Sequence, residues 1–253
     1  MVGRWRVKHL SWFSAGAASA VATKLALSMY DDVTIYRTDV GSEHPDNERF
    51  SADCAEWFGQ EVKTIKVEKY EDTWDVWEST GYLVGPTGAR CTVELKKKAR
   101  FMVERDYDVQ VFGYTADPRD AKRANRFRLL NPEITLSTPL IDRGLTKRDC
   151  LAMVERAGID LPFMYKAGYA NNNCIGCVKG GMGYWNKIRV DFPETFDRMA
   201  TLERTLGHTV LREDDGPLFL DLLEPSRGNY ADEPDMECSL LCALAEDEIE
   251  DDA

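Results

Sequence analysis

Near its beginning the chain reads Trp12-Phe-Ser-Ala-Gly-Ala-Ala-Ser-Ala20, a segment dominated by small residues. It follows Arg4–Leu10, which has strand composition, and it precedes Ala20–Tyr30, where apolar residues recur at helical spacing. The pattern predicts a strand, a tight loop of small residues and a helix. Backbone N–H groups in such a loop can approach an anion, the helix dipole favours it, and the hydroxyls of Ser14 and Ser19 can add hydrogen bonds. An ordinary strand-to-helix turn is the alternative, and the missing lysine excludes a Walker A loop.

Segments of strand and helix composition alternate along the next part of the chain. Strands are predicted over 32–40, 61–67, 108–114 and 138–141, and helices over 44–60, 73–80, 92–107, 118–130, 147–157 and 185–206, the last broken near Pro193. Because this alternation favours a parallel sheet, we expect an α/β fold whose twisted parallel sheet of about five strands has helices on both faces. Residues 1–160 would form this domain. Residues 161–253 would form a C-terminal region with a CxxC loop, helices and an acidic tail.

Composition limits the classes of function. The net charge of −12 disfavours broad binding to nucleic acid. No run of about 18 apolar residues and no signal-peptide stretch is present, so we expect a cytoplasmic protein without a membrane partner. The oligomeric state stays open. Seven cysteines in 253 residues favour metal binding or redox chemistry over disulfides. Two of them, Cys54 and Cys150, fall in helical patterns and are expected to be buried structural residues.

Three loops that follow predicted strands are expected to meet at one site, because ligands of open α/β sheets bind outside the carboxyl ends of the strands. The residues expected to bind a nucleotide or another anion are Ser14, Gly16, Ala17, Ser19, Asp39, Gly41, Arg119, Lys122, Arg123 and Arg126. The four basic residues recur at spacings of three and four in one predicted helix. They form a candidate anion clamp. The alternative is a solvated face paired with Asp117 and Asp120.

The other five cysteines include the candidates for a metal site. Cys174 and Cys177 make a CxxC in a loop rich in glycine and asparagine, and Cys91 opens a predicted helix, where the dipole acidifies a thiol. Cys238 and Cys242 lie in the acidic tail. Thiolate-rich sites suit an iron–sulfur cluster or zinc, so either metal centre is expected here.

Four motifs resemble the PP-loop superfamily of adenine-nucleotide alpha hydrolases. Within it, the chain is most similar to the phosphoadenylyl-sulfate (PAPS) and adenylyl-sulfate (APS) reductases, especially phage-type members. Residues 14–19 (SAGAAS) stand where the superfamily has SGGxDS, 38–45 (TDVGSEHP) are similar to DTGxxFPET, 113–123 to the basic substrate-binding segment, and 237–240 (ECSL) to the C-terminal ECGL. Cys91 and the distant CxxC are similar to the cysteines that hold a 4Fe–4S cluster in APS reductases, with one cysteine in place of a Cys-Cys pair.

The resemblance implies a sulfonucleotide reductase-like enzyme. The thiolate of Cys238 would attack the sulfur of bound PAPS or APS, and a thioredoxin-like reductant would then release sulfite. The site residues above would bind the adenine nucleotide or sulfonucleotide. The resemblance also implies a 4Fe–4S cluster on Cys91, Cys174 and Cys177, with Cys242 as a further candidate ligand and zinc as the alternative metal.

Two other functions remain open from the sequence. The first is an ATP-dependent sulfurtransferase of the PP-loop class, which would thiolate a nucleic acid base or a metabolite with a cluster that has an open iron. The second is a non-catalytic nucleotide-binding protein with a structural metal. Ala15 and Ala18 stand where the superfamily has glycine and aspartate, which puts ATP pyrophosphatase activity in question.

Overall fold

The computed structural model describes residues 7–86, 88–105, 108–234 and 236. The chain divides into two compact units that interleave along the sequence. Unit 1 combines the described parts of Met1–Asp39, Pro45–Val67 and Lys98–Asn172, and unit 2 combines those of Val40–His44, Glu68–Lys97 and Asn173–Ala253. The predicted domains 1–160 and 161–253 therefore each contribute residues to both units.

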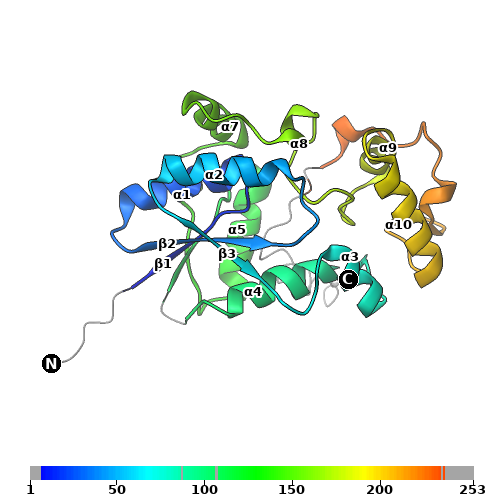
Figure 1. The fold of residues 1–253 in the computed structure, drawn as a ribbon, viewed down its shortest axis with the longest axis horizontal. Helices are drawn as coiled ribbons and strands as arrows, with labels where there is room; N and C mark the ends of the chain where they lie inside the picture. Colours follow the sequence, from blue (N-terminus) through cyan, green and yellow to red (C-terminus); the bar gives the residue numbers. More distant parts are fainter. Residues whose placement is uncertain (1–6, 87, 106–107, 235, 237–253) are drawn as a thin grey trace. The chain divides into compact units, whose positions relative to one another are not determined.

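The centre of unit 1 is a parallel sheet of five strands (Figure 1). The strands are β1 (His9–Trp12), β2 (Val33–Asp39), β3 (Val62–Lys66), β6 (Val109–Val111) and β7 (Thr135–Ser137). Their order is β3-β2-β1-β6-β7, and every neighbouring pair is parallel. The predicted parallel sheet is confirmed, and its architecture is compatible with a Rossmann-like fold.

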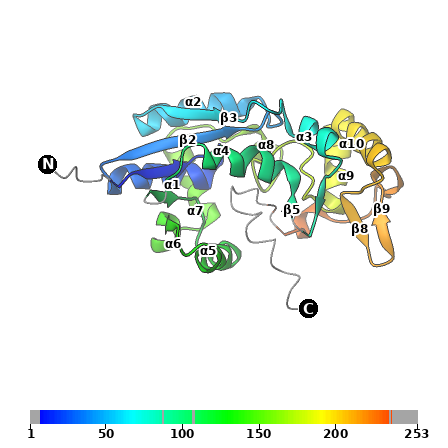
Figure 2. The same cartoon turned by 90° about the horizontal axis from the view of Figure 1, so that it is seen from below.

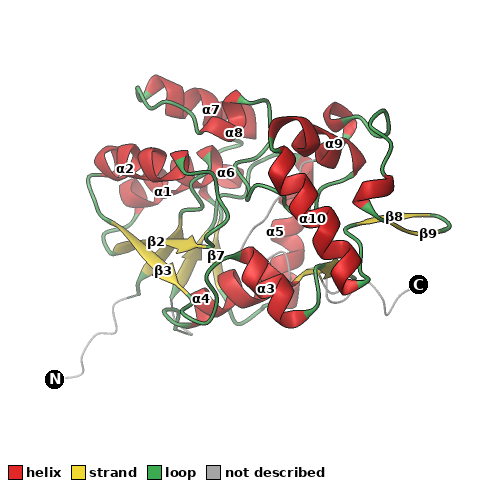
Figure 3. Cartoon of the chain, turned by 45° about the vertical axis from the view of Figure 1, so that its right-hand side comes forward, coloured by secondary structure: helices red, strands yellow, loops and turns green. Residues whose placement is uncertain are grey.

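Helices flank this sheet on both faces (Figure 3). The helices of unit 1 are α1 (Ala17–Met29), α2 (Asp46–Phe58), α4 (Lys98–Phe101), α5 (Pro118–Leu130), α6 (Pro139–Asp142), α7 (Lys147–Arg156) and α8 (Phe163–Lys166). Ser11 of β1 contacts Thr23 of α1 through their hydroxyl oxygens at 2.9 Å. The next residue, Trp12, stacks on Phe112, which packs against Phe127 of α5. Because successive strand residues point to opposite faces, α1 and α5 cover different faces. On the α1 side, α6 and α7 pack against α1 (Figure 2).

Several boundaries differ from the prediction. Within the described residues the first strand is His9–Trp12 and α1 begins at Ala17, so the loop between them is shorter than expected. The strand predicted over 138–141 is wrong: β7 ends at Ser137, and Pro139 begins the short helix α6. Proline lacks the N–H that a sheet ladder needs, whereas the first turn of a helix tolerates it.

Unit 2 contains shorter elements. They are α3 (Thr73–Thr80), β4 (Val84–Gly85), β5 (Gly88–Ala89), the π-helix η1 (Thr92–Lys97), α9 (Met182–Asp191), α10 (Pro193–Leu206), β8 (Leu211–Glu213), β9 (Gly216–Leu218), and the 3-10 helices η2 (Leu220–Leu222) and η3 (Tyr230–Asp232). The predicted helix over 73–80 and the break at Pro193 are confirmed. The single helix predicted over 92–107 is instead η1 followed by α4 of unit 1 within the described residues.

A buried carboxylate connects α10 to the segment that follows it in unit 2. Glu203 has 0% exposure, and its two oxygens accept hydrogen bonds from the backbone N–H groups of Val210 and Leu220, both at 2.7 Å. Burial raises the pKa of Glu203 from 4.5 to about 7, and the two hydrogen bonds oppose this shift only in part. The folded protein therefore binds this proton more tightly than the unfolded chain does.

The raised pKa of Glu203 predicts that the stability of the protein depends on pH. Because the pKa is raised in the folded protein, the stabilising contribution of the protonated Glu203 side chain to the free energy of unfolding is fully present below about pH 4.5. It is lost as pH rises through about 7. Across that window the free energy of unfolding should fall by on the order of 3 kcal/mol relative to the Glu203→Gln variant. Denaturant titrations of both proteins at several pH values measure this difference. A difference that does not change with pH would contradict the assignment.

Candidate functional site

The carboxyl ends of β1 and β6 lie side by side at the centre of the unit 1 sheet. Strand order reverses at this point, with β2 and β3 on one side and β7 on the other. The chain leaves β1 for α1 on one face and leaves β6 for α5 on the other. Such a switch point is where open α/β sheets bind ligands. The predicted anion-binding segments after β1 and β6 therefore flank it.

The loop after β1 folds around the hydroxyl of Ser19. This oxygen accepts hydrogen bonds from the N–H of Ser14 at 3.0 Å and from the Ser14 hydroxyl at 3.1 Å, and it donates to the carbonyl oxygen of Gly16 at 2.9 Å. Ser19 is buried, whereas Ser14 is exposed. The Ser19 hydroxyl thus stabilises the loop, and the Ser14 side chain is the one open to solvent.

The backbone of this loop takes a left-handed conformation at Ala15. Its φ is +54°, the one positive φ outside glycine among the described residues. Ala15 is also fully buried, with 0% exposure. This conformation costs an L-residue with a Cβ about 1–2 kcal/mol, and glycine is the residue that adopts it freely. The SGGxDS motif has glycine at this position.

Gly113, two residues after the end of β6, approaches the beginning of α1 too closely for any side chain. A Cβ at this position would lie 2.8 Å from both the Cα and the backbone nitrogen of Ser19. Only glycine therefore allows the loop after β6 to lie this close to the beginning of α1 at the switch point.

The close approach of Gly113 yields a stability prediction. Gly113→Ala should lower the free energy of unfolding by about 2–4 kcal/mol, because the clash is with backbone that cannot rotate away. Gly16→Ala is the control: its φ is −108° and the nearest atom to its added Cβ is the Tyr165 hydroxyl, at 3.3 Å. Denaturant unfolding should rank Gly113→Ala as clearly the more damaging change. Equal free energies of unfolding for the two variants would mean that Gly113 does not lie this close to α1.

The basic residues of α5 divide into two kinds. Arg123 donates to Asp120 at 2.8 Å, and its guanidinium lies over the Tyr114 ring, 5.4 Å from the ring centre. Asp120 is 4% exposed, so this ion pair is largely buried. Arg123 therefore has the pairing with Asp120 that the alternative named, but in a buried pair and not on a solvated face. Arg119 and Lys122 are exposed, and Arg126 is half-buried.

Asp39 and Gly41 belong to different units. Asp39 is the half-buried last residue of β2 in unit 1. Gly41 belongs to unit 2 and has a φ of +69°. A Cβ there would lie 2.5 Å from the carbonyl oxygen of Glu71 and 2.7 Å from the Cβ of Asp72. The glycine of this predicted motif is therefore required by local packing.

Two residues that sequence reasoning missed contact the loop after β1. The side-chain nitrogen of Asn172 donates to the carbonyl oxygen of Ala15 at 2.7 Å and to Oδ1 of Asn47 at 2.7 Å. The Tyr165 hydroxyl accepts from the N–H of Ala17 at 3.4 Å. Both residues lie about 150 positions from the loop, and the only local signal was the asparagine-rich composition around Asn172.

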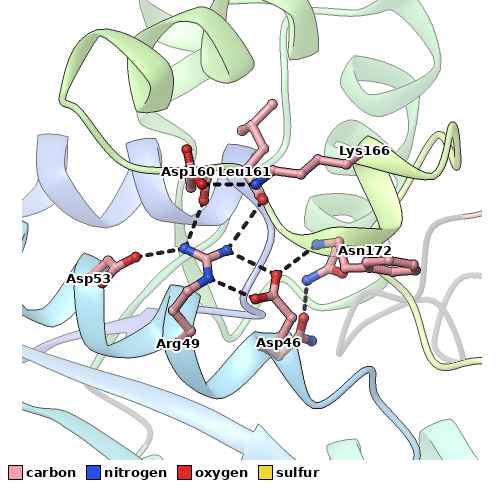
Figure 4. A network of polar contacts seen from close by, with 9 residues as sticks. Asp46, Arg49, Asp53, Asp160, Leu161, Lys166 and Asn172 are labelled. Atoms are coloured by element: carbon pink, nitrogen blue, oxygen red, sulfur yellow. Dashed lines mark hydrogen bonds and ion pairs between the residues drawn. The ribbon is translucent and has the colours of Figure 1, made fainter.

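Tyr165 and Asn172 lie in the segment 160–172. Arg49 of α2 binds this segment through hydrogen bonds (Figure 4). Its guanidinium donates to both carboxylate oxygens of Asp46, at 2.7 and 2.9 Å. It also donates to the carbonyl oxygens of Asp160 at 3.2 Å and Leu161 at 3.3 Å. Asp46 accepts a further hydrogen bond from the N–H of Phe163 at 2.8 Å. Bidentate pairs of this kind are geometrically specific, so the segment has a defined position against α2.

The CxxC lies in a tightly packed turn of unit 2. Cys174 and Cys177 are 8% and 7% exposed. The N–H of Cys177 donates to the Tyr184 hydroxyl at 2.9 Å. Between the cysteines, Gly176 has a φ of +76°, and a Cβ there would lie 2.6 Å from Cγ2 of Thr195. Glycine in this turn is therefore required by both conformation and packing.

Cys91 belongs to the same unit as the CxxC and directly precedes η1. Segments of π-helix are rare and occur frequently at functional sites. Among the residues that the structure describes, no group of three or more His, Cys, Asp or Glu side chains is arranged to hold a metal ion. Cys238 and Cys242 lie outside the described residues. The thiol donors suit iron–sulfur or zinc chemistry, and the shared metal site stays a prediction.

Cys54 and Cys150 are structural residues, as predicted. Both have 0% exposure and lie in the core cluster around α1. Burial raises the pKa of each thiol to about 12. Protonated thiols of this kind are poor ligands and poor nucleophiles, so these two cysteines serve as controls for the others.

Comparison with known proteins adds no assignment: no family model matches the chain, and no curated protein is significantly similar to it in sequence. Among the described residues, none of the helices combines the length and the apolar composition that crossing a membrane requires.

Proposed function

We propose that the chain is a sulfonucleotide reductase-like enzyme that binds PAPS or APS at the carboxyl ends of β1 and β6. The observation that carries the proposal is the conformation of Ala15. Its φ of +54° lies where the PP-loop motif has glycine, one residue before the Gly16 cap of α1. A loop of this shape at a switch point is suited to an anionic nucleotide.

The charges near this loop support an anionic ligand. The α1 dipole favours negative charge at its beginning, where Gly16 and Ala17 contribute backbone N–H groups. On α5, Arg119 and Lys122 are exposed and can meet phosphate or sulfate oxygens. Arg123 is engaged with Asp120, so its proposed part is to fix the position of this helix rather than to bind the ligand alone.

The proposed reaction is a thiol-based transfer. The Cys238 thiolate attacks the sulfur of the sulfonucleotide, an S–S bond forms, and the S–O bond to the nucleotide phosphate breaks. The nucleotide leaves with the electron pair of that bond, and Cys238 carries a thiosulfonate. A thiol of a thioredoxin-like dithiol then attacks the Cys238 sulfur and releases sulfite. Its second thiol resolves the mixed disulfide, so the dithiol is oxidised and Cys238 returns as a thiolate.

A metal centre in unit 2 is part of the proposal. Cys91, Cys174 and Cys177 would hold it, with Cys242 as a further candidate ligand. Their thiolates suit a 4Fe–4S cluster, and zinc is the alternative. When bound through three thiolates, such a cluster supplies an iron that is open to another ligand.

The proposed function is tested by determining which nucleotide the protein converts. Anaerobically purified protein is incubated separately with PAPS, APS and ATP in the presence of reduced thioredoxin. We expect sulfite from PAPS or APS and no pyrophosphate from ATP. Consumption of ATP with release of pyrophosphate or AMP would replace the proposal with the sulfurtransferase function. Nucleotide binding without any turnover would replace it with the non-catalytic one.

A further inference from the structure

We infer that Asn172 is a positioning residue whose side-chain amide holds the loop at Ala15 in its left-handed conformation. Its functional consequence rests on the proposed nucleotide site. In this chain a side chain distant in sequence stabilises the left-handed conformation, which glycine adopts freely in the PP-loop motif. We call the contacts of Asn172 with Ala15 and Asn47 the amide clamp.

The amide clamp is short, buried and defined in orientation. Nδ2 of Asn172 lies 2.7 Å from the carbonyl oxygen of Ala15 and 2.7 Å from Oδ1 of Asn47. Asn172 is 7% exposed and Asn47 is 1% exposed. A backbone carbonyl only accepts hydrogen bonds, so the nitrogen of the amide, not its oxygen, must face Ala15.

The energies of the two opposing effects are comparable. An alanine in the left-handed region is disfavoured by its Cβ, whereas a buried amide–carbonyl hydrogen bond is favourable by a similar amount. Without the amide clamp, the carbonyl oxygen of Ala15 would also be left buried without this donor. The clamp can therefore decide which conformation the loop adopts.

The conformation at Ala15 sets the direction of the peptide groups that follow it. The carbonyl oxygen of Gly16 accepts from Ser19 Oγ at 2.9 Å and from the N–H of Ala20 at 3.0 Å, which starts α1. The N–H of Ala17 points to the Tyr165 hydroxyl at 3.4 Å, a long hydrogen bond. The N–H of Ala17 lies in the first turn of α1, where an anion at the beginning of the helix would bind.

The other end of the amide clamp is held firmly. Asn47 is in the first turn of α2, next to Asp46. Asp46 binds Arg49 and the N–H of Phe163, which fix the segment that carries Asn172. The clamp thus links the loop to α2 and to the segment 160–172 of the same unit.

The Asn172→Asp variant tests the inference with almost no change of shape. At about pH 8 the aspartate is ionised and presents only acceptors to the oxygens of Ala15 and Asn47. We expect hydrogen exchange at the amides of Ser14 and Ala17 to be roughly tenfold faster in the nucleotide-free protein, because loss of one buried hydrogen bond has about that effect. The affinity for the adenosine bisphosphate product of PAPS reduction should fall by a similar factor.

A second substitution separates positioning from general destabilisation. Adding Ala15→Gly to Asn172→Ser, which also lacks the amide clamp but brings no negative charge, should restore slow exchange and nucleotide affinity, because glycine adopts the left-handed conformation without the clamp. Asn186→Asp is the matched control. Its Nδ2 also donates to two oxygens, here the backbone carbonyl oxygens of Glu224 at 2.9 Å and Arg227 at 2.6 Å, but in unit 2. It should change neither measurement.

The outcomes distinguish the inference from the proposed function. Unchanged exchange in Asn172→Asp, or a loss of slow exchange in Asn172→Ser that Ala15→Gly does not reverse, would overturn the amide clamp. If the unaltered protein binds no adenosine bisphosphate, the proposed function fails, while exchange and its reversal still test the clamp. Should Asn172→Asp not fold, Asn172→Ser carries the same expectation, because its hydroxyl is too short to reach Ala15.

Discussion

Replacing Cys238 with serine is expected to abolish sulfite release from PAPS or APS, with a loss of roughly a thousandfold or more, because the attacking thiolate is removed. Nucleotide affinity should change little, since the proposed binding residues lie in unit 1. Sulfite release under saturating substrate and calorimetric titration of the nucleotide measure the two quantities separately.

The control for this change is Ser239→Ala, which alters the neighbouring residue of the ECSL motif and leaves the thiol. It should retain most of the turnover. Substantial sulfite release by Cys238→Ser would exclude Cys238 as the nucleophile. Loss of nucleotide affinity together with turnover would instead indicate that the tail is needed for binding.

Cys174→Ser is expected to remove most of the iron and sulfide from anaerobically purified protein, together with the brown colour of iron–thiolate charge transfer. The reason is that a hydroxyl is a much poorer ligand for a soft metal centre than a thiolate. Cys91→Ser and Cys177→Ser should have the same effect if the three thiols share one centre. Metal analysis and absorption spectra of the three variants provide the measurement.

Cys150→Ser makes the same chemical change in the core of unit 1 and is the matched control. It should lower stability while leaving the metal content unchanged, because burial keeps this thiol protonated. Iron content that is equal in Cys174→Ser and in the unaltered protein would contradict a cluster at the CxxC. Zinc in place of iron would establish the alternative metal.

The parts of the fold with strong local signals could be predicted from the sequence. The helix over 118–130 was predicted with its observed ends because Pro118 suits a first turn and the pattern that follows is helical. The β7 strand was misplaced because three residues with little burial carry almost no period-two signal. The interleaving of the two units depends on long-range contacts that no local pattern encodes.

The candidate site was predictable in the same uneven way. The segments after β1 and β6 could be found because short motifs mark them and because parallel strands place their carboxyl ends together. The internal pairing of Arg123 with Asp120 was weighed as an alternative and is what the structure contains. Asn172 could not be found, because its contact with Ala15 spans 157 positions along the chain.

If Cys238 takes the sulfonate from a bound sulfonucleotide, the sulfonate group is attached to its thiol before any reductant acts. The most direct measurement is mass spectrometry of the protein mixed with PAPS or APS in the absence of any reductant. We predict that the peptide containing Cys238 gains the mass of one sulfonate group, and that added thioredoxin removes it as sulfite. An unmodified Cys238 in protein that has bound the sulfonucleotide, or a gain of a single sulfur atom instead, would contradict the account.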